Sequence, residues 1–266
     1  MKTNSIRVFL LPAVWAIAFP LFSQQDAADL AKQLANPVAS LISVPFQNNA
    51  DFGIGQWEGT RNTMNFQPVV PISISEKLNL INRIIVPVVA QYSITGPGER
   101  QTGMADALYS GFFSPKDSKN GFTWGAGPAL LLPIGAPEMF TTKQFAVGPT
   151  TVALKQSGGW TYGGLINQLW SVAGNDERPD VNQLFVQPFA IYNWSSGAGA
   201  GVNFEFTQNW TASQTTLWFN PFINGVTSFG KQKVQLAIGP RFNLAAPEGA
   251  RANWGVRTAA TLLFPK

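Results

Sequence analysis

The chain contains neither cysteine nor histidine. Without cysteine there is no disulfide, no thiol nucleophile and no cysteine for lipid attachment. Without histidine, the usual zinc sites and the His-based dyads of serine hydrolases and phospholipases cannot be assembled. The sequence therefore predicts a protein that is not an enzyme and needs no metal or cofactor.

Charge is scarce as well. Charged residues make up 12% of the chain, whereas a soluble domain usually carries about 25%. Polarity comes instead from 36 Asn and Gln residues, and a surface so poor in charge would be poorly soluble. The net charge of +4 is too small to indicate a nucleic-acid partner.

Only the N-terminus carries a long apolar run. Lys2 and Arg7 precede apolar residues 8–22, and Ser23 is a small residue suited to cleavage, which predicts a signal peptide over residues 1–23. A membrane anchor helix would need about 20 apolar residues, but this run is shorter and contains Pro12 and Pro20. We therefore expect an exported protein with no spanning helix.

Aromatic and aliphatic residues are abundant: 45% of the chain is hydrophobic, with 9 Trp and 20 Phe. An exported chain with little charge, many aromatics and no spanning helix is best explained by a β-barrel of the bacterial outer membrane, in contact with lipid.

Residues 24–40 have apolar positions at helical spacing and end near Pro37, which predicts a short amphipathic helix. Two placements stay open, as a plug in the lumen or at the periplasmic mouth.

From residue 41 the hydrophobic period changes to two, which predicts an all-β domain over residues 41–266, an antiparallel barrel of about twelve strands. Long polar connections alternate with mostly tight ones, as extracellular loops and periplasmic turns do, and Asn48–Asn62 is predicted to be a long loop. The expected strands are 41–47, 63–73, 78–94, 104–113, 122–132, 144–155, 160–173, 181–194, 199–209, 216–226, 233–244 and 253–264.

Alternation along the strands separates an apolar outward face from a polar inward face. Proline recurs within the runs, and each proline removes a ladder donor, so bulges or local gaps are expected there. The residues predicted to line the lumen are Arg83, Asp106, Gln183, Gln187, Asn203, Glu205, Lys233, Arg241 and Arg257.

The predicted lumen residues include more bases than acids, which predicts a net positive interior that prefers anions. Two interpretations are open. The charges could form a constriction that selects solutes, or they could form structural pairs that hold a narrow lumen closed.

Several segments resemble a family of bacterial outer-membrane proteins labelled as a component of the MetA pathway of phenol degradation. They include NFQPVVPISI, LINQLWSVAG and VNQLFVQPFAIY, and the resemblance spans nearly the whole mature chain. The family implies a β-barrel transporter for aromatic or other hydrophobic compounds. The chain departs from the usual C-terminal barrel pattern because Pro265 and Lys266 follow Phe264.

The sequence thus predicts a channel for passive uptake of small hydrophobic or aromatic solutes. The alternative is a structural or surface-binding protein with a sealed lumen. Neither the solute nor the oligomeric state follows from the sequence.

Overall fold

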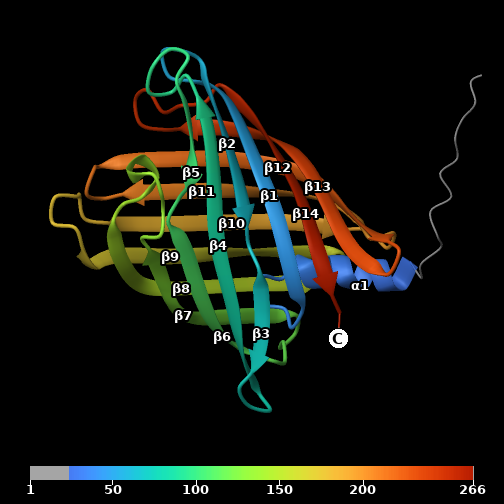
Figure 1. Cartoon of the computed structure of the whole chain (residues 1–266). Coiled ribbons are helices and arrows are strands. Elements are labelled where there is room, and N and C mark those ends of the chain that lie inside the picture. Colours follow the sequence, from blue (N-terminus) through green and yellow to red (C-terminus); the bar gives the residue numbers. More distant parts are fainter. Residues whose placement is uncertain (1–23, 266) are drawn as a thin grey trace, which may run out of the picture.

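The computed structural model describes residues 24–265, which form a closed antiparallel β-barrel preceded by one helix (Figure 1). Adjacent positions around the barrel follow chain order, and the last strand returns to the first in a ladder from Ile42↔Phe264 to Phe52↔Trp254. Closure satisfies the backbone groups that an open sheet would leave at its edges, as a membrane barrel requires. The predicted signal peptide, residues 1–23, lies outside the described residues.

Within residues 24–265, fourteen strands make twelve barrel positions, as the sequence predicts. Two positions are each shared by two short strands, β2 with β3 and β5 with β6, and all four pair with β4. The strands are β1 (Ile42–Ile54), β2 (Gly59–Phe66), β3 (Val69–Ser73), β4 (Leu78–Tyr92), β5 (Arg100–Met104), β6 (Ala107–Pro115), β7 (Phe122–Leu132), β8 (Gln144–Ser157), β9 (Trp160–Gly174), β10 (Asn182–Asn193), β11 (Ala198–Asn209), β12 (Gln214–Phe229), β13 (Gln232–Ala245) and β14 (Trp254–Phe264).

The prediction of a long loop over Asn48–Asn62 is wrong. β1 continues to Ile54 and β2 begins at Gly59, so only residues 55–58 connect them. The polar run that suggested a loop is instead a pair of strands whose inward positions are polar. Asn and Asp are depleted in ordinary strands, and a polar lumen overrides that preference.

The outer surface is apolar and ends in aromatic side chains. Large hydrophobic residues are exposed along the outward face of most strands, which suits contact with lipid. Exposed aromatic residues lie near both ends of the strands, as in the interfacial girdles of membrane proteins. They include Trp160, Tyr162, Tyr192, Trp170, Trp210 and Trp254.

The strand prolines coincide with gaps in the ladders. Pro128 and Pro149 are paired with each other between β7 and β8. Towards its other neighbouring strand, each proline is one of two consecutive unpaired positions. Pro188 interrupts the pairing of β10 with β11 in the same way. The widest gap separates β12 from β13, where no pair is formed between Phe219↔Phe242 and Ile223↔Ile238. The expected local gaps are therefore present.

The helix α1 (Gln24–Leu34) lies at the end of the barrel that carries the tight turns (Figure 1). Barrel side chains hold its C-terminal turn, because Gln156 Nε2 donates to the backbone oxygen of Lys32 at 2.8 Å. The segment after the helix enters the lumen. There Val38 is buried with Ile81, Phe112, Val152, Leu154 and Leu165.

The described residues 24–265 contain no helix long and apolar enough to cross a membrane.

Candidate functional site

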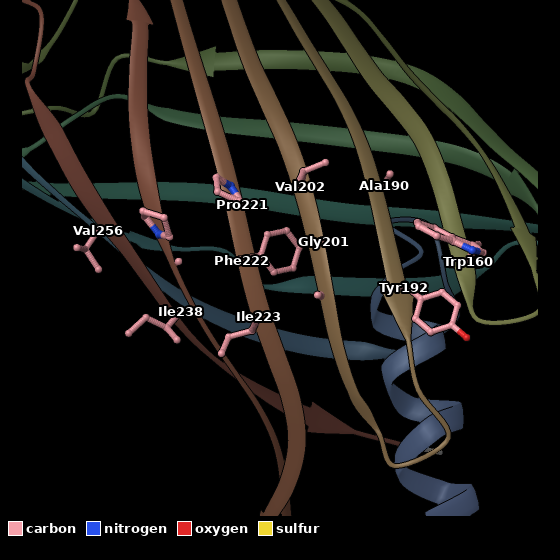
Figure 2. A pocket seen from close by; sticks show the side chains of 13 residues that line it. Trp160, Ala190, Tyr192, Gly201, Val202, Pro221, Phe222, Ile223, Ile238 and Val256 are labelled. Atoms are coloured by element: carbon pink, nitrogen blue, oxygen red, sulfur yellow. The ribbon is translucent and has the colours of Figure 1, made fainter.

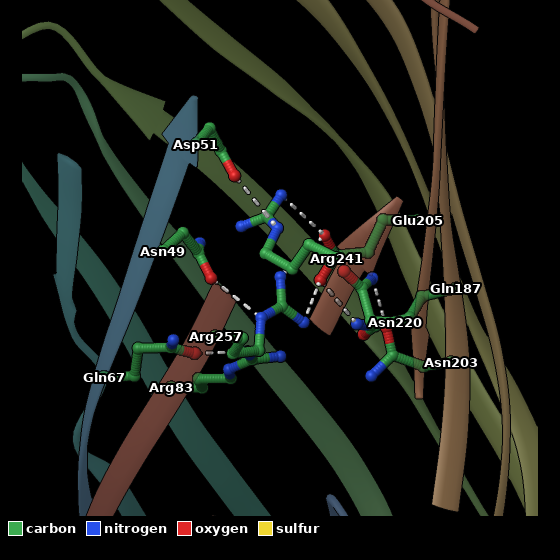
Figure 3. A network of polar contacts seen from close by, with 10 residues as sticks. All are labelled: Asn49, Asp51, Gln67, Arg83, Gln187, Asn203, Glu205, Asn220, Arg241 and Arg257. Atoms are coloured by element: carbon green, nitrogen blue, oxygen red, sulfur yellow. Dashed lines mark hydrogen bonds and ion pairs between the residues drawn. The ribbon is translucent and has the colours of Figure 1, made fainter. Parts of the chain in front are cut away.

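The interior of the barrel holds a cluster of charged and amide side chains from strands far apart in the sequence (Figure 3). At its centre, Arg257 of β14 and Glu205 of β11 form a two-bond ion pair. Arg257 Nη1 lies 2.8 Å from Glu205 Oε1, and Nη2 donates to Oε2 at 2.9 Å. Arg257 Nε also donates to Asn49 Oδ1 at 2.8 Å. This geometry fixes both planar groups.

Arg241 of β13 lies beside this pair. Its Nε is 3.4 Å from Asp51 Oδ1 and its Nη2 is 3.9 Å from Glu205 Oε2. The guanidinium also lies over the ring of Trp218, 4.1 Å from the ring centroid. Arg241 is 4% exposed, yet its Nε and Nη1 make no hydrogen bond in the described structure. Two arginines therefore share two carboxylates, with Arg241 the more weakly held.

Arg83 of β4 lies where two interior cavities meet. Its Nη2 donates to Gln67 Oε1 at 2.7 Å. Both cavities are lined by Arg83, Gln67 and Gln187. The cavity on the side of α1 has a volume of about 220 Å³ and is lined in part by residues of the segment 33–39, and the other has about 270 Å³. Arg83 therefore borders both cavities.

The remaining predicted lumen residues have different surroundings. Gln183 lines the larger cavity, and Asn203 Oδ1 accepts a hydrogen bond of 2.9 Å from Asn220 Nδ2. Lys233 stands at the opposite end of β13 from the charge cluster, paired in register with Ser228 and Leu263.

Asp106 does not join the cluster, contrary to the prediction that groups it with the lumen charges. It lies in the break between β5 and β6, where the register on β4 shifts by one residue. Its carboxylate accepts hydrogen bonds from Gly135 N at 3.1 Å and from Thr142 N and Oγ1, both at 2.7 Å. Asp106 therefore fastens the loop of residues 133–143 to the barrel wall.

Sequence reasoning misses Asp51 and Arg61, which belong to the same interior face. Asp51 pairs in register with Arg61 on one side and with Gly255 on the other. Both fall in the segment predicted to be a loop, but the alternation Asn49, Asp51 against Ala50, Phe52 carries the inward pattern and could have revealed the strand.

A second feature lies on the outer wall, over the gap between β12 and β13 (Figure 2). It is an apolar depression of about 960 Å³ bordered by Pro221 and Pro240, neither of which has a ladder donor. Gly201, Phe222 and Gly239 also line it, although their position in the register gives them inward parity. Two of the three have no side chain, so the wall is thin there.

The described residues 24–265 contain no group of three or more Asp, Glu, His or Cys side chains that could hold a metal ion. The arrangement offers instead a positive, partly apolar interior and an apolar depression on the outer wall.

No family model matches the chain, and no curated protein matches it. The resemblance to the MetA-pathway family therefore stays a prediction.

Among solved structures, the chain is similar to the COG4313 outer membrane channel from Pseudomonas putida F1, with a TM-score of 0.65 and 14% identity over 84% of this chain and 94% of that one. Weaker matches are a loop-deletion mutant of OmpT from Vibrio cholerae (TM-score 0.42, 7% identity, 84% and 98% covered) and outer membrane phospholipase A from Escherichia coli (TM-score 0.41, 9% identity, 90% and 98% covered). Likeness at this identity shows the fold, and the fold is that of a bacterial outer-membrane β-barrel.

Proposed function

We propose that the chain is a passive channel that admits small hydrophobic or aromatic solutes through the outer membrane. The observation that carries the proposal is the apolar depression of about 960 Å³ over the unpaired stretch of β12 and β13. This surface faces the lipid, so an apolar solute that reaches it from the lumen could pass into the membrane without returning to water. The similar protein from Pseudomonas putida is itself an outer membrane channel, which also supports the proposal.

The route we propose runs through the wall. The lumen is closed towards α1 by the segment around Val38, and the cavities on either side of Arg83 are small. Arg241 lies on the interior side of the β12–β13 gap, and Pro221 and Pro240 lie on the exterior side. A solute entering from outside the cell would reach the membrane sideways at this gap, without energy input, cofactor or catalytic step.

A second candidate is a structural or surface-binding protein with a sealed lumen. The small size of the two cavities that Arg83 borders, and the segment of residues 33–39 that lines one of them, favour it. The two candidates differ in whether blocking the wall gap changes uptake.

The test is a reversible cross-link across the gap. The chain has no native cysteine, so the double variant Pro221→Cys/Pro240→Cys carries one engineered pair. In a strain that otherwise lacks the chain, oxidation should lower uptake of radiolabelled naphthalene towards the level of cells without the barrel, and reductant should restore it. The proposal would be wrong if the cells took up naphthalene equally with and without the chain.

The matched control is Phe204→Cys/Phe219→Cys, which links β12 to β11 at a regular pair. Oxidising this pair should leave uptake unchanged, because the strands are already joined there. If both cross-links lowered uptake equally, the effect would come from stiffening of the barrel and the lateral route would be rejected.

A further inference from the structure

The larger interior cavity has two chemically different walls. On one side Ile85, Leu108, Leu131, Leu165, Leu169 and Phe185 form an apolar surface. These residues come from β4, β6, β7, β9 and β10, which are neighbours around one side of the barrel except for the intervening β8. The rest of the lining is polar and includes the guanidinium groups of Arg83 and Arg257 and the carboxylate of Glu205, which is paired with Arg257. The uncharged polar residues of the lining are Gln47, Asn49, Asn65, Gln67, Ser110, Asn167, Gln183 and Gln187. An occupant of this cavity must therefore carry both an apolar body and a polar end.

The polar side has an excess of positive charge. The carboxylates of the cluster are already engaged, Asp51 by Arg241 and Glu205 by both Arg241 and Arg257. Among the described residues, no carboxylate oxygen lies within 4.0 Å of the guanidinium of Arg83 or of Arg61. Arg83 donates a hydrogen bond to Gln67, and its side chain faces the cavity. Arg83 is partly exposed where it borders the cavity, and an anion placed beside it there would add a charge-assisted contact that Gln67 does not supply.

The size and shape of the cavity restrict that anion. A volume of about 270 Å³ exceeds the roughly 150 Å³ that holds benzene in an engineered apolar cavity. A guanidinium fork matches the planar geometry of a carboxylate. A hydrated inorganic anion would leave the leucine wall in contact with water, so the apolar side disfavours it.

We propose that this cavity is a binding site for a small aromatic monocarboxylate, with the carboxylate on Arg83 and the ring against the wall of Leu131, Leu165 and Phe185. This inference rests on the proposed function for the route by which the ligand enters. It narrows the solute from any hydrophobic compound to one with a single carboxylate. The ion pair of Arg257 with Glu205 holds the adjoining part of the wall in place.

Calorimetric titration of the purified full barrel in detergent micelles tests the site, with empty micelles as the reference. Three probes are titrated. Benzoate carries a ring and a carboxylate, acetate carries only the carboxylate, and benzyl alcohol carries the ring without the charge. Benzoate should bind more tightly than either of the others. Arg83→Gln should lower the affinity for benzoate by about 10- to 100-fold, as expected for loss of a charge-assisted contact. The affinity for benzyl alcohol should not change.

Two further variants separate the site from general damage. Leu131→Asn should lower the affinity for benzoate and for benzyl alcohol but not for acetate, because it changes only the apolar wall. Lys119→Gln, in the turn of residues 116–121, should change none of the three. Every variant must keep the electrophoretic shift of a folded barrel, and Arg83→Lys, which keeps the charge, should retain part of the benzoate affinity.

Equal benzoate affinity in the parent and in Arg83→Gln would overturn the proposed site, as would benzyl alcohol binding as tightly as benzoate. If oxidation of the wall cross-link lowers naphthalene uptake but benzoate does not bind, the carboxylate site is wrong and the proposed channel is supported. If benzoate binds with the expected dependence on Arg83 but naphthalene uptake does not change on cross-linking, the binding site is supported and the lateral route is wrong.

Discussion

Glu205 is the acid on which the interior charges converge. It contacts both Arg257 and Arg241, and Gln187 Nε2 donates to it at 3.3 Å. Asp51 lies on the far side of Arg241. These contacts agree with the interpretation of the arginines as members of structural pairs, while Arg83 keeps a face towards the cavity.

The first residue-scale prediction concerns this pair. Glu205→Gln leaves Arg257 buried without its acid, and breaking a buried pair in this way should lower the free energy of unfolding by about 3–5 kcal/mol. Urea titration of the barrel in lipid vesicles measures the change. Glu177→Gln, in the exposed loop of residues 175–181, is the matched control and should have no effect.

Removing both partners should cost less than the sum of the two single losses. In Glu205→Gln/Arg257→Gln no uncompensated charge remains from the pair, so the double variant should lose less stability than the sum of the losses in Glu205→Gln and Arg257→Gln, by a coupling energy of about 0.5–3 kcal/mol. If the two losses simply added, the ion pair would contribute nothing and the buried-pair argument would fail.

At the scale of elements, the segment between α1 and β1 closes one end of the lumen. Val38 is 4% exposed and packs among inward side chains of β4, β6, β8 and β9. Gly125 of β7 leaves room for it, because a Cβ added at that glycine would lie 3.2 Å from Val38 Cγ1. The segment is held by this apolar contact and by hydrogen bonds from the barrel to α1.

Val38→Asp should therefore open the lumen. A carboxylate in that apolar cluster costs several kcal/mol, more than the local contacts of a short segment supply, so the segment should leave the lumen while the ladders remain. The conductance of single barrels in planar bilayers should rise several-fold. Lys32→Gln, at an exposed position of α1, should leave conductance unchanged. Equal conductance in Val38→Asp and the parent would show that the ion path does not pass this segment.

At the scale of the whole molecule, the ladder between β1 and β14 closes the barrel. Closure removes both sheet edges, and this makes a barrel resistant to unfolding by detergent until it is heated. Outer-membrane fractions should contain the chain as a band whose electrophoretic mobility changes on boiling. Deleting residues 254–264 should abolish that shift, because β13 and β1 would become open edges. Recovery of the intact chain in soluble form from the periplasm would contradict the membrane location.

Much of the barrel could be predicted from sequence, because alternation is local. The inward and outward parity of the last strand pair follows from a period of two along Lys233, Gln235 and Arg241, and the structure keeps that register. Turn residues separate the runs and give the twelve positions. The prolines predicted to interrupt the ladders do so because a missing N–H is a property of the residue itself.

The chain by itself therefore determined the all-β class, the number of barrel positions and the face of most side chains. Only the tertiary structure decided which charges meet. Glu205 reaches Arg257 across strands that are not neighbours in the sheet, and Asp51 reaches Arg241 only after β14 closes on β1. Such contacts depend on the curvature and closure of the whole sheet, which no local pattern of residues encodes.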